Sequence, residues 1–113
     1  MTQKIMIITR REQREDLIGL CRKNKYDLKV VADIERCLLA AGGEMHIEEE
    51  RALIADGSKP ANLWGANYFP KENRITYTSM INIKPARDNL FEEISDPLTR
   101  SAVRLIILHL LGE

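Results

Sequence analysis

The stretch AAGGEMHIEEERALIADGS, Ala40 to Ser58, holds the residues of this chain that are best suited to chemistry. Glu44 and His46 lie two positions apart, so their side chains share one side of the chain if this segment is extended. A carboxylate and an imidazole nitrogen can hold a metal ion together, or the histidine can act as a base that the carboxylate orients. The pair therefore marks a candidate site.

A working site needs a further group, because two protein ligands are too few for a structural zinc site. A third ligand would have to come from Asp33, Glu35 or one of the glutamates at 48–50, and their spacing does not show that any of them approaches His46. The alternative is a histidine at the entry of a helix, bonded to backbone. We favour this alternative and predict no metal and no cofactor.

The glycines and glutamates of the same stretch can be explained as the ends of helices. Gly42 and Gly43 fit a helix C-terminus, because glycine adopts a positive φ without strain. The glutamates at 48–50 fit the first turn of the next helix, where carboxylates meet free backbone amides. That helix would end at Gly57 and Ser58.

The preceding residues, 28–41, have apolar side chains at helical spacing with a charged row between them, which predicts a helix. A hairpin with Glu35 and Arg36 at its turn is the alternative, because valine and isoleucine also favour strands. Upstream, an isoleucine-rich run predicts a strand at 4–9, and a helix should follow from about residue 10 to residue 24.

Residues 61–84 are expected to form a hairpin in which Phe69 faces Arg74. One face is then apolar and belongs to the core; it carries Trp64, Ala66, Tyr68, Ile75, Tyr77, Ile81 and Ile83. The other face is a polar strip with Gly65, Asn67, Thr76, Thr78 and Asn82. The candidate surface for a ligand or partner is formed by Asn67, Asn82, Gly65 and Arg36. Plain solvent-facing surface is the alternative.

The C-terminal helix has the clearest start and stop signals. Asp96 can cap its first amides, Pro97 fits the first helical position, and Gly112 follows the last turn. Seven of the nine residues at 103–111 are apolar, which is more than one stripe can bury against a single sheet. We therefore predict a homodimer, with a helix wrapped by its own domain as the alternative. The predicted contact residues are Leu105, Ile106, Leu108 and Leu110.

The composition narrows the class of protein. The 113 residues fit one domain and carry 17 basic and 17 acidic side chains, so no overall field attracts nucleic acid or an anionic membrane. RNA binding is therefore disfavoured; it would use Arg10, Arg11, Arg14, Arg22 and Lys23. No apolar leader opens the chain, and no apolar run reaches the ~18 residues of a membrane span. A cytoplasmic protein without a membrane partner is expected.

Three sequence blocks are similar to a family of small uncharacterised prokaryotic proteins, a domain of unknown function. They are Gly-Gly-Glu-x-His at 42–46, Leu-Trp-Gly-x-Asn at 63–67 and Ile-Asn-Ile-Lys-Pro at 81–85. The resemblance covers roughly residues 30–85, and the chain departs from it at Lys84, where the family tends to have arginine. It implies no activity. It implies a shared pattern that contains Asp33, Glu35, Arg36, Glu44, His46, Trp64, Asn67 and Asn82.

These patterns predict one α+β domain over residues 1–113. A small antiparallel sheet, made of the N-terminal strand and the hairpin at about 61–84, should be covered by about four helices. We expect a non-enzymatic binding or regulatory module that acts as a homodimer, with a protein or small-molecule partner. The alternatives are a small hydrolase or metal-dependent enzyme that uses Glu44 and His46, helped by Asp33 or Glu35, and an RNA-binding module.

Overall fold

The computed structural model describes residues 5–21 and 27–112 of the chain. In chain order, the strands and helices are β1 (Met6–Ile8), α1 (Arg14–Cys21), β2 (Leu28–Asp33), β3 (Leu38–Ala41), α2 (His46–Ala55), β4 (Leu63–Phe69), β5 (Arg74–Thr76) and α3 (Pro97–Leu111). Single turns of 3-10 helix lie at 11–13, 60–62, 80–82 and 85–87. The fold belongs to the α+β class, as predicted.

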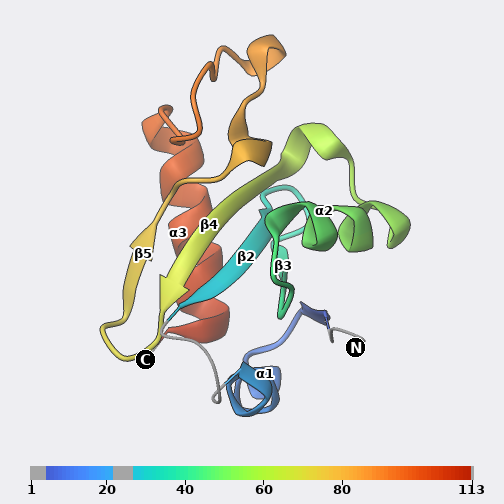
Figure 1. Cartoon of the computed structure of the whole chain (residues 1–113), viewed down its shortest axis with the longest axis vertical. Coiled ribbons are helices and arrows are strands. Elements are labelled where there is room, and N and C mark those ends of the chain that lie inside the picture. The colour runs from blue at the N-terminus through green and yellow to red at the C-terminus, as the bar shows by residue number, and fades with distance from the viewer. Residues whose placement is uncertain (1–4, 22–26, 113) are drawn as a thin grey trace.

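The strands form one antiparallel sheet in the order β1-β3-β2-β4-β5. Figure 1 shows α3 crossing one face of this sheet while α2 lies on the other. The central strand β2 contributes to an apolar cluster on each face. Val30 and Ala32 pack in the cluster that contains Ile107 of α3, whereas Val31 packs in the cluster that contains Leu53 of α2.

The helix predicted for residues 28–41 is wrong, because these residues form the β2–β3 hairpin that was the alternative interpretation. A strand covered on both faces carries a continuous apolar run, which cannot be told from a buried helix by periodicity. At the turn, Asp33 Oδ1 accepts hydrogen bonds from the backbone amides of Glu35 and Arg36, each at 2.9 Å. The described residues therefore hold three α-helices, not about four.

The β4–β5 hairpin has the predicted register, with Phe69 opposite Arg74. On the side of α3, β4 buries the side chains of Trp64, Ala66 and Tyr68. This face belongs to the core, as predicted.

The second strand of the hairpin is shorter than predicted. β5 ends at Thr76, and residues 77–95 leave the sheet as an irregular segment. Ile81 and Ile83, which were expected on the core face beside Trp64, lie elsewhere for this reason. Ile81 packs in the α2-side cluster, and Ile83 is 43 % exposed.

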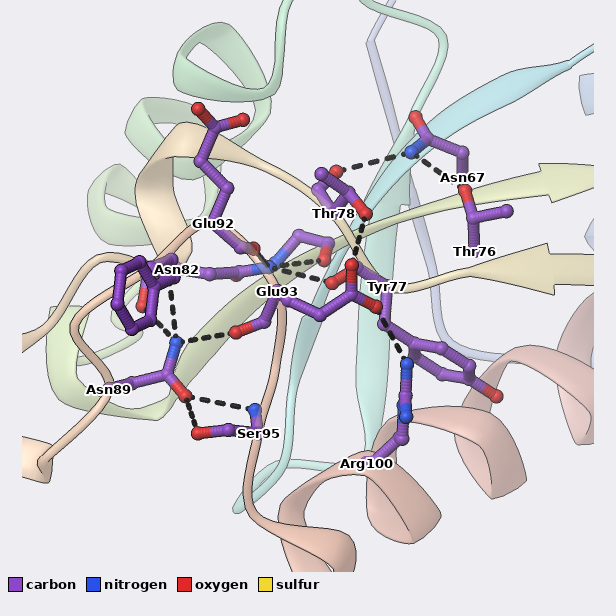
Figure 2. Close-up of polar contacts among 12 residues, drawn as sticks. Asn67, Thr76, Tyr77, Thr78, Asn82, Asn89, Glu92, Glu93, Ser95 and Arg100 are labelled. Atoms are coloured by element: carbon purple, nitrogen blue, oxygen red, sulfur yellow. Dashed lines mark hydrogen bonds and ion pairs between the residues drawn. The ribbon is translucent and has the colours of Figure 1, made fainter.

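Two buried asparagines hold the irregular segment against the edge of β4 that β5 does not cover. The side-chain amide of Asn82 pairs with the backbone of Gly65: Oδ1 accepts from the Gly65 amide at 2.7 Å, and Nδ2 donates to the Gly65 carbonyl at 3.0 Å. Nδ2 also donates to the Glu92 carbonyl at 3.0 Å. Asn89 donates to the carbonyls of Asn82 and Glu93, both at 2.8 Å (Figure 2).

α3 begins and ends as predicted. Asp96 Oδ2 accepts hydrogen bonds from the amide and the hydroxyl of Thr99, at 3.0 and 2.7 Å, Pro97 is the first helical residue, and Gly112 follows the last. A carboxylate at this position satisfies amides that have no partner within the helix.

Arginines from the N-terminal part of the chain bond the C-terminal carbonyls of α3. Arg11 Nη1 donates to the His109 carbonyl at 2.9 Å, Arg11 Nη2 bonds the Gly112 carbonyl, and Arg14 Nε donates to the Leu111 carbonyl at 2.6 Å. Cations are favourable here because the helix C-terminus carries free carbonyls and the negative end of the dipole. α1 begins at Arg14, later than the predicted helix, and residues 22–24 of that prediction lie outside the described residues.

Gly65→Ala should destabilise the fold. The added Cβ would lie 2.6 Å from the Cβ and 2.7 Å from the Oγ of Ser79, which is itself buried. We expect the free energy of unfolding to fall by about 1–3 kcal/mol, as for other overpacked positions.

Gly19→Ala is the matched control, because its Cβ would meet nothing within 4 Å and the residue lies inside α1. Its free energy of unfolding should rise by about 0.5–1 kcal/mol. Urea unfolding measures both changes. A Gly65→Ala midpoint equal to that of the unsubstituted chain would contradict the packing described here.

Candidate functional site

His46 is the first residue of α2 and lies over the middle of β4. Its Nε2 is 2.8 Å from the carbonyl oxygen of Ala66. The neighbouring Gly65 leaves room for the ring, since a Cβ at that position would lie 3.2 Å from His46 Cδ2. His46 thus lies at a helix entry and is bonded to backbone, as the alternative interpretation expected.

The tautomer and the charge of His46 follow from this contact. A carbonyl oxygen only accepts, so Nε2 carries the proton and Nδ1 holds the lone pair of the neutral ring. Burial lowers the pKa of His46 below 6.5; the hydrogen bond to Ala66 opposes this, Lys29 lowers the pKa further, and Asp27 raises it. At neutral pH the ring is thus neutral, with a basic nitrogen that bonds to no other described residue.

Glu49 lies one turn after His46, on the same face of α2, and its side chain is fully buried. Its Oε2 accepts from the Gly43 amide at 2.9 Å, while Oε1 is buried and has no hydrogen-bond partner in the described part of the chain. Burial raises the pKa of Glu49 to about 9, although the Gly43 amide and Lys29 act in the opposite direction and Glu48 adds to the rise. The carboxyl group is therefore protonated at neutral pH.

Lys29 and Asn67 complete the cluster from the sheet, where they are paired directly across β2 and β4. Asn67 Nδ2 donates to the Thr76 hydroxyl and the Thr78 carbonyl, both at 3.1 Å (Figure 2). Its Oδ1 is buried and bonds to none of the described residues. Lys29, half-buried, likewise forms no hydrogen bond or ion pair within residues 5–21 and 27–112. We call His46, Glu49, Lys29 and Asn67 the α2 site.

The α2 site brings four different chemical groups to one face of the sheet. The His46 ring supplies a lone pair, Glu49 a neutral acid, Lys29 an ammonium group and Asn67 a carbonyl oxygen. Among the described residues, no group of three or more His, Cys, Asp or Glu side chains is placed to hold a metal ion. The arrangement is suited to hydrogen bonding with a ligand or to proton transfer.

The other candidates for the Glu44–His46 site lie apart from it. Asp33 is at the far end of β2 from Lys29, roughly 13 Å away at the usual rise per strand residue. It orders the β2–β3 turn, and Glu35 Oε1 accepts from Asn62 Nδ2 at 2.7 Å. Glu44 is exposed. The structure thus brings His46 together with Lys29 and Glu49, and not with Asp33 or Glu35.

The residues predicted to form a ligand or partner surface do not form one surface in the structure. Asn67 belongs to the α2 site, whereas the amide of Asn82 is bonded to the backbone of Gly65 and Glu92. Arg36 lies in the β2–β3 turn and ties it to the end of α2, with Nη1 2.6 Å from Ser58 Oγ and Nη2 2.8 Å from Asp56 Oδ2.

The candidate dimer residues of α3 are not equally accessible. Ile106 and Leu110 are buried in the core of the chain itself, and Leu108 is half-buried. Leu105 is 64 % exposed.

Sequence reasoning missed Lys29, and it named Glu49 only as one of the three glutamates that could supply a third ligand. The spacing of three between His46 and Glu49 is a signal for one helix face, but the glutamate was already explained by the first turn of α2. Lys29 could be found only through its pairing with Asn67, which the sequence does not reveal.

The comparisons with known proteins complete these observations. The model of the family described as protein of unknown function (DUF5674) matches residues 6–110. The resemblance to an uncharacterised family is therefore confirmed. No curated protein and no solved structure matches the chain. Within its described residues, no helix has the length and apolar character needed to cross a membrane.

Glu49→Gln should change how stability depends on pH. In the folded chain Glu49 keeps a proton up to a pKa of about 9, whereas the unfolded chain loses it near 4.5, so rising pH favours unfolding between these values. The titration of Glu49 lowers the free energy of unfolding by at most about 1.4 kcal/mol for each pH unit in this range. Glutamine keeps an acceptor for the Gly43 amide and removes the titration.

Thermal unfolding between pH 5 and pH 9 tests this expectation. The stability of Glu49→Gln relative to the unsubstituted chain should increase with pH, while Glu50→Gln, on the same helix, should follow the unsubstituted chain. Parallel pH profiles for the unsubstituted chain and Glu49→Gln would show that Glu49 is ionised in the fold.

His46 should titrate below pH 6.5 in proton NMR, and its signal can be assigned with His46→Gln because the chain has two histidines. Lys29→Met should raise the midpoint, since the lysine charge disfavours the imidazolium. Lys59→Met, at an exposed position, is the control. A His46 midpoint at or above 6.5, or one that Lys29→Met leaves unchanged, would contradict the site.

Proposed function

Since the chain belongs to a family of unknown function, DUF5674, we propose its function from the geometry of the α2 site. The protein is a non-enzymatic binding module that holds a small polar ligand against β2, β4 and the first turn of α2.

One observation carries this proposal: Glu49 Oε1 and Asn67 Oδ1 are both buried on the same face of the sheet and neither has a partner in the described residues. A buried polar atom without a hydrogen bond costs about 1–3 kcal/mol. Two such atoms beside a lysine that also bonds to no described residue support a site that a ligand completes.

The four groups define the chemistry of the ligand. The lone pair of His46 and the carbonyl of Asn67 accept hydrogen bonds, whereas the Lys29 ammonium and the protonated Glu49 donate them. The ligand therefore carries a hydroxyl or amine next to an anionic or carbonyl oxygen. Hydroxy acids have this combination and can be used to probe the site.

A panel of glycolate, malate and tartrate should identify such binding by thermal shift. At a concentration ten times the Kd, a ligand adds about 1.4 kcal/mol, which raises the Tm by about 4–8 °C in a domain of this size. Lys29→Met and Asn67→Ala should lose the shift, and Lys59→Met should keep it. Equal shifts in all of these variants, or no shift with any member of the panel, would contradict the proposal.

A small enzyme, such as a hydrolase, is the second candidate. It is favoured by the opposite displacement of two pKa values, that of His46 downward and that of Glu49 upward, which leaves a neutral base and a neutral acid on one helix face. Against it, His46 bonds to no serine, threonine or cysteine among the described residues. Turnover of a panel member that His46→Gln abolishes while binding persists would favour the enzyme.

A homodimer through α3 is part of the proposal. Leu98 and Leu105 are 80 % and 64 % exposed and lie seven residues apart, so they share one face of the helix. Exposed leucines two turns apart support a contact with a second copy.

Leu105→Asp should convert the dimer into a monomer without unfolding it, because this side chain lies outside the core. Sedimentation at tens of micromolar measures the mass, and Arg104→Gln, exposed on the same helix, serves as the control. A monomeric mass for the unsubstituted chain would exclude the dimer.

A further inference from the structure

A cleft with a volume of about 310 Å³ lies between residues 87–96 and the first turn of α3, and Trp64 of β4 lines it. The walls are fixed by hydrogen bonds. Ser95 Oγ donates to Asn89 Oδ1 at 2.6 Å (Figure 2), and Asp96 holds the amide and hydroxyl of Thr99. These contacts make a preformed site, which small ligands usually require.

Trp64 lines the cleft, and its indole nitrogen lies buried behind the cleft surface. The residue is 2 % exposed, and its Nε1 is buried without a hydrogen-bond partner in the described chain. A buried indole N–H usually has a partner. The ring is held by Lys84, whose Nζ lies 5.3 Å from the ring centroid and donates to the Pro60 carbonyl at 3.2 Å.

Charges of both signs border the same cleft. Arg87 lines it and has one long hydrogen bond, from Nη2 to Asn62 Oδ1 at 3.4 Å. The carboxylate of Asp88 also lines it and forms no hydrogen bond or ion pair with the rest of the described chain, and Asp96 adds a second carboxylate. Such a lining suits a ligand that carries both charges better than a simple anion or cation.

We propose that this cleft binds a small zwitterion of the α-amino-acid class. The carboxylate of the ligand accepts from the Arg87 guanidinium, and its ammonium group meets Asp88 and Asp96. This site is separate from the α2 site, and its two carboxylates require a cationic group that the α2 site does not require. The two proposals therefore stand or fall independently.

The chain contains a single tryptophan, which lines this cleft, so its fluorescence can be used to follow binding there. Each of the twenty common L-amino acids is titrated into the full chain, with acetate and methylammonium as single-charge probes. At least one amino acid should change the emission of Trp64 in a saturable way, with an affinity at least tenfold higher than that of either single-charge probe.

Three variants test whether the change in Trp64 emission comes from binding in the cleft. Arg87→Gln and Asp88→Asn should each weaken binding at least tenfold; asparagine tolerates the positive φ of 58° at position 88. Lys29→Met, in the α2 site, should bind as the unsubstituted chain does. Circular dichroism verifies that each variant folds.

The proposal is overturned if no amino acid gives a saturable change, if acetate or methylammonium binds as well as the best amino acid, or if both cleft variants retain full affinity. It is also overturned if Lys29→Met alone removes the response, because the ligand would then occupy the α2 site.

Discussion

The pairing of the Asn82 side chain with the backbone of Gly65 is the interaction on which the surrounding structure depends. β5 covers only the last residues of β4, and at Gly65 an amide side chain takes the place of a neighbouring strand. Because Gly65 has no side chain, Ser79 approaches closely and the His46 ring fits beside it. The backbone amide and carbonyl of Gly65 thus have hydrogen-bond partners without a further strand, so the irregular segment can lie along this edge of β4 instead.

The two faces of the sheet differ in what they bury. The face under α3 is apolar across β4 and β2, whereas the face under α2 contains a fully buried carboxyl group. A protonated Glu49 lowers stability at neutral pH, since folding must displace its pKa from 4.5 to about 9. An apolar residue could fill this position without that penalty. A residue whose burial lowers the stability of the fold and whose pKa is strongly shifted is a candidate for a functional role.

The sequence was most informative where local chemistry decides the structure. The cap of α3 at Asp96 and the register of Phe69 with Arg74 follow from signals within a few residues, and both were predicted. The β2–β3 hairpin was predicted as a helix because both faces of β2 are covered, so the alternation of a surface strand is missing. The α2 site was found only in part. His46 stood out as a rare residue type beside glycines, but the electrostatic influence of Lys29 on it depends on the pairing of β2 with β4, which joins residues far apart in the chain.

The arginines that bond the C-terminal carbonyls of α3 have a consequence for synthesis of the chain. Arg11 and Arg14 lie 97 to 101 residues before the carbonyls that they bond. At the usual rate of translation, the ribosome adds these intervening residues in about 5–20 s. During that interval the carbonyls of α3 are not yet available to these guanidinium groups. The contact between these arginines and α3 therefore forms only after α3 has been made, long after the N-terminal residues that contribute to it.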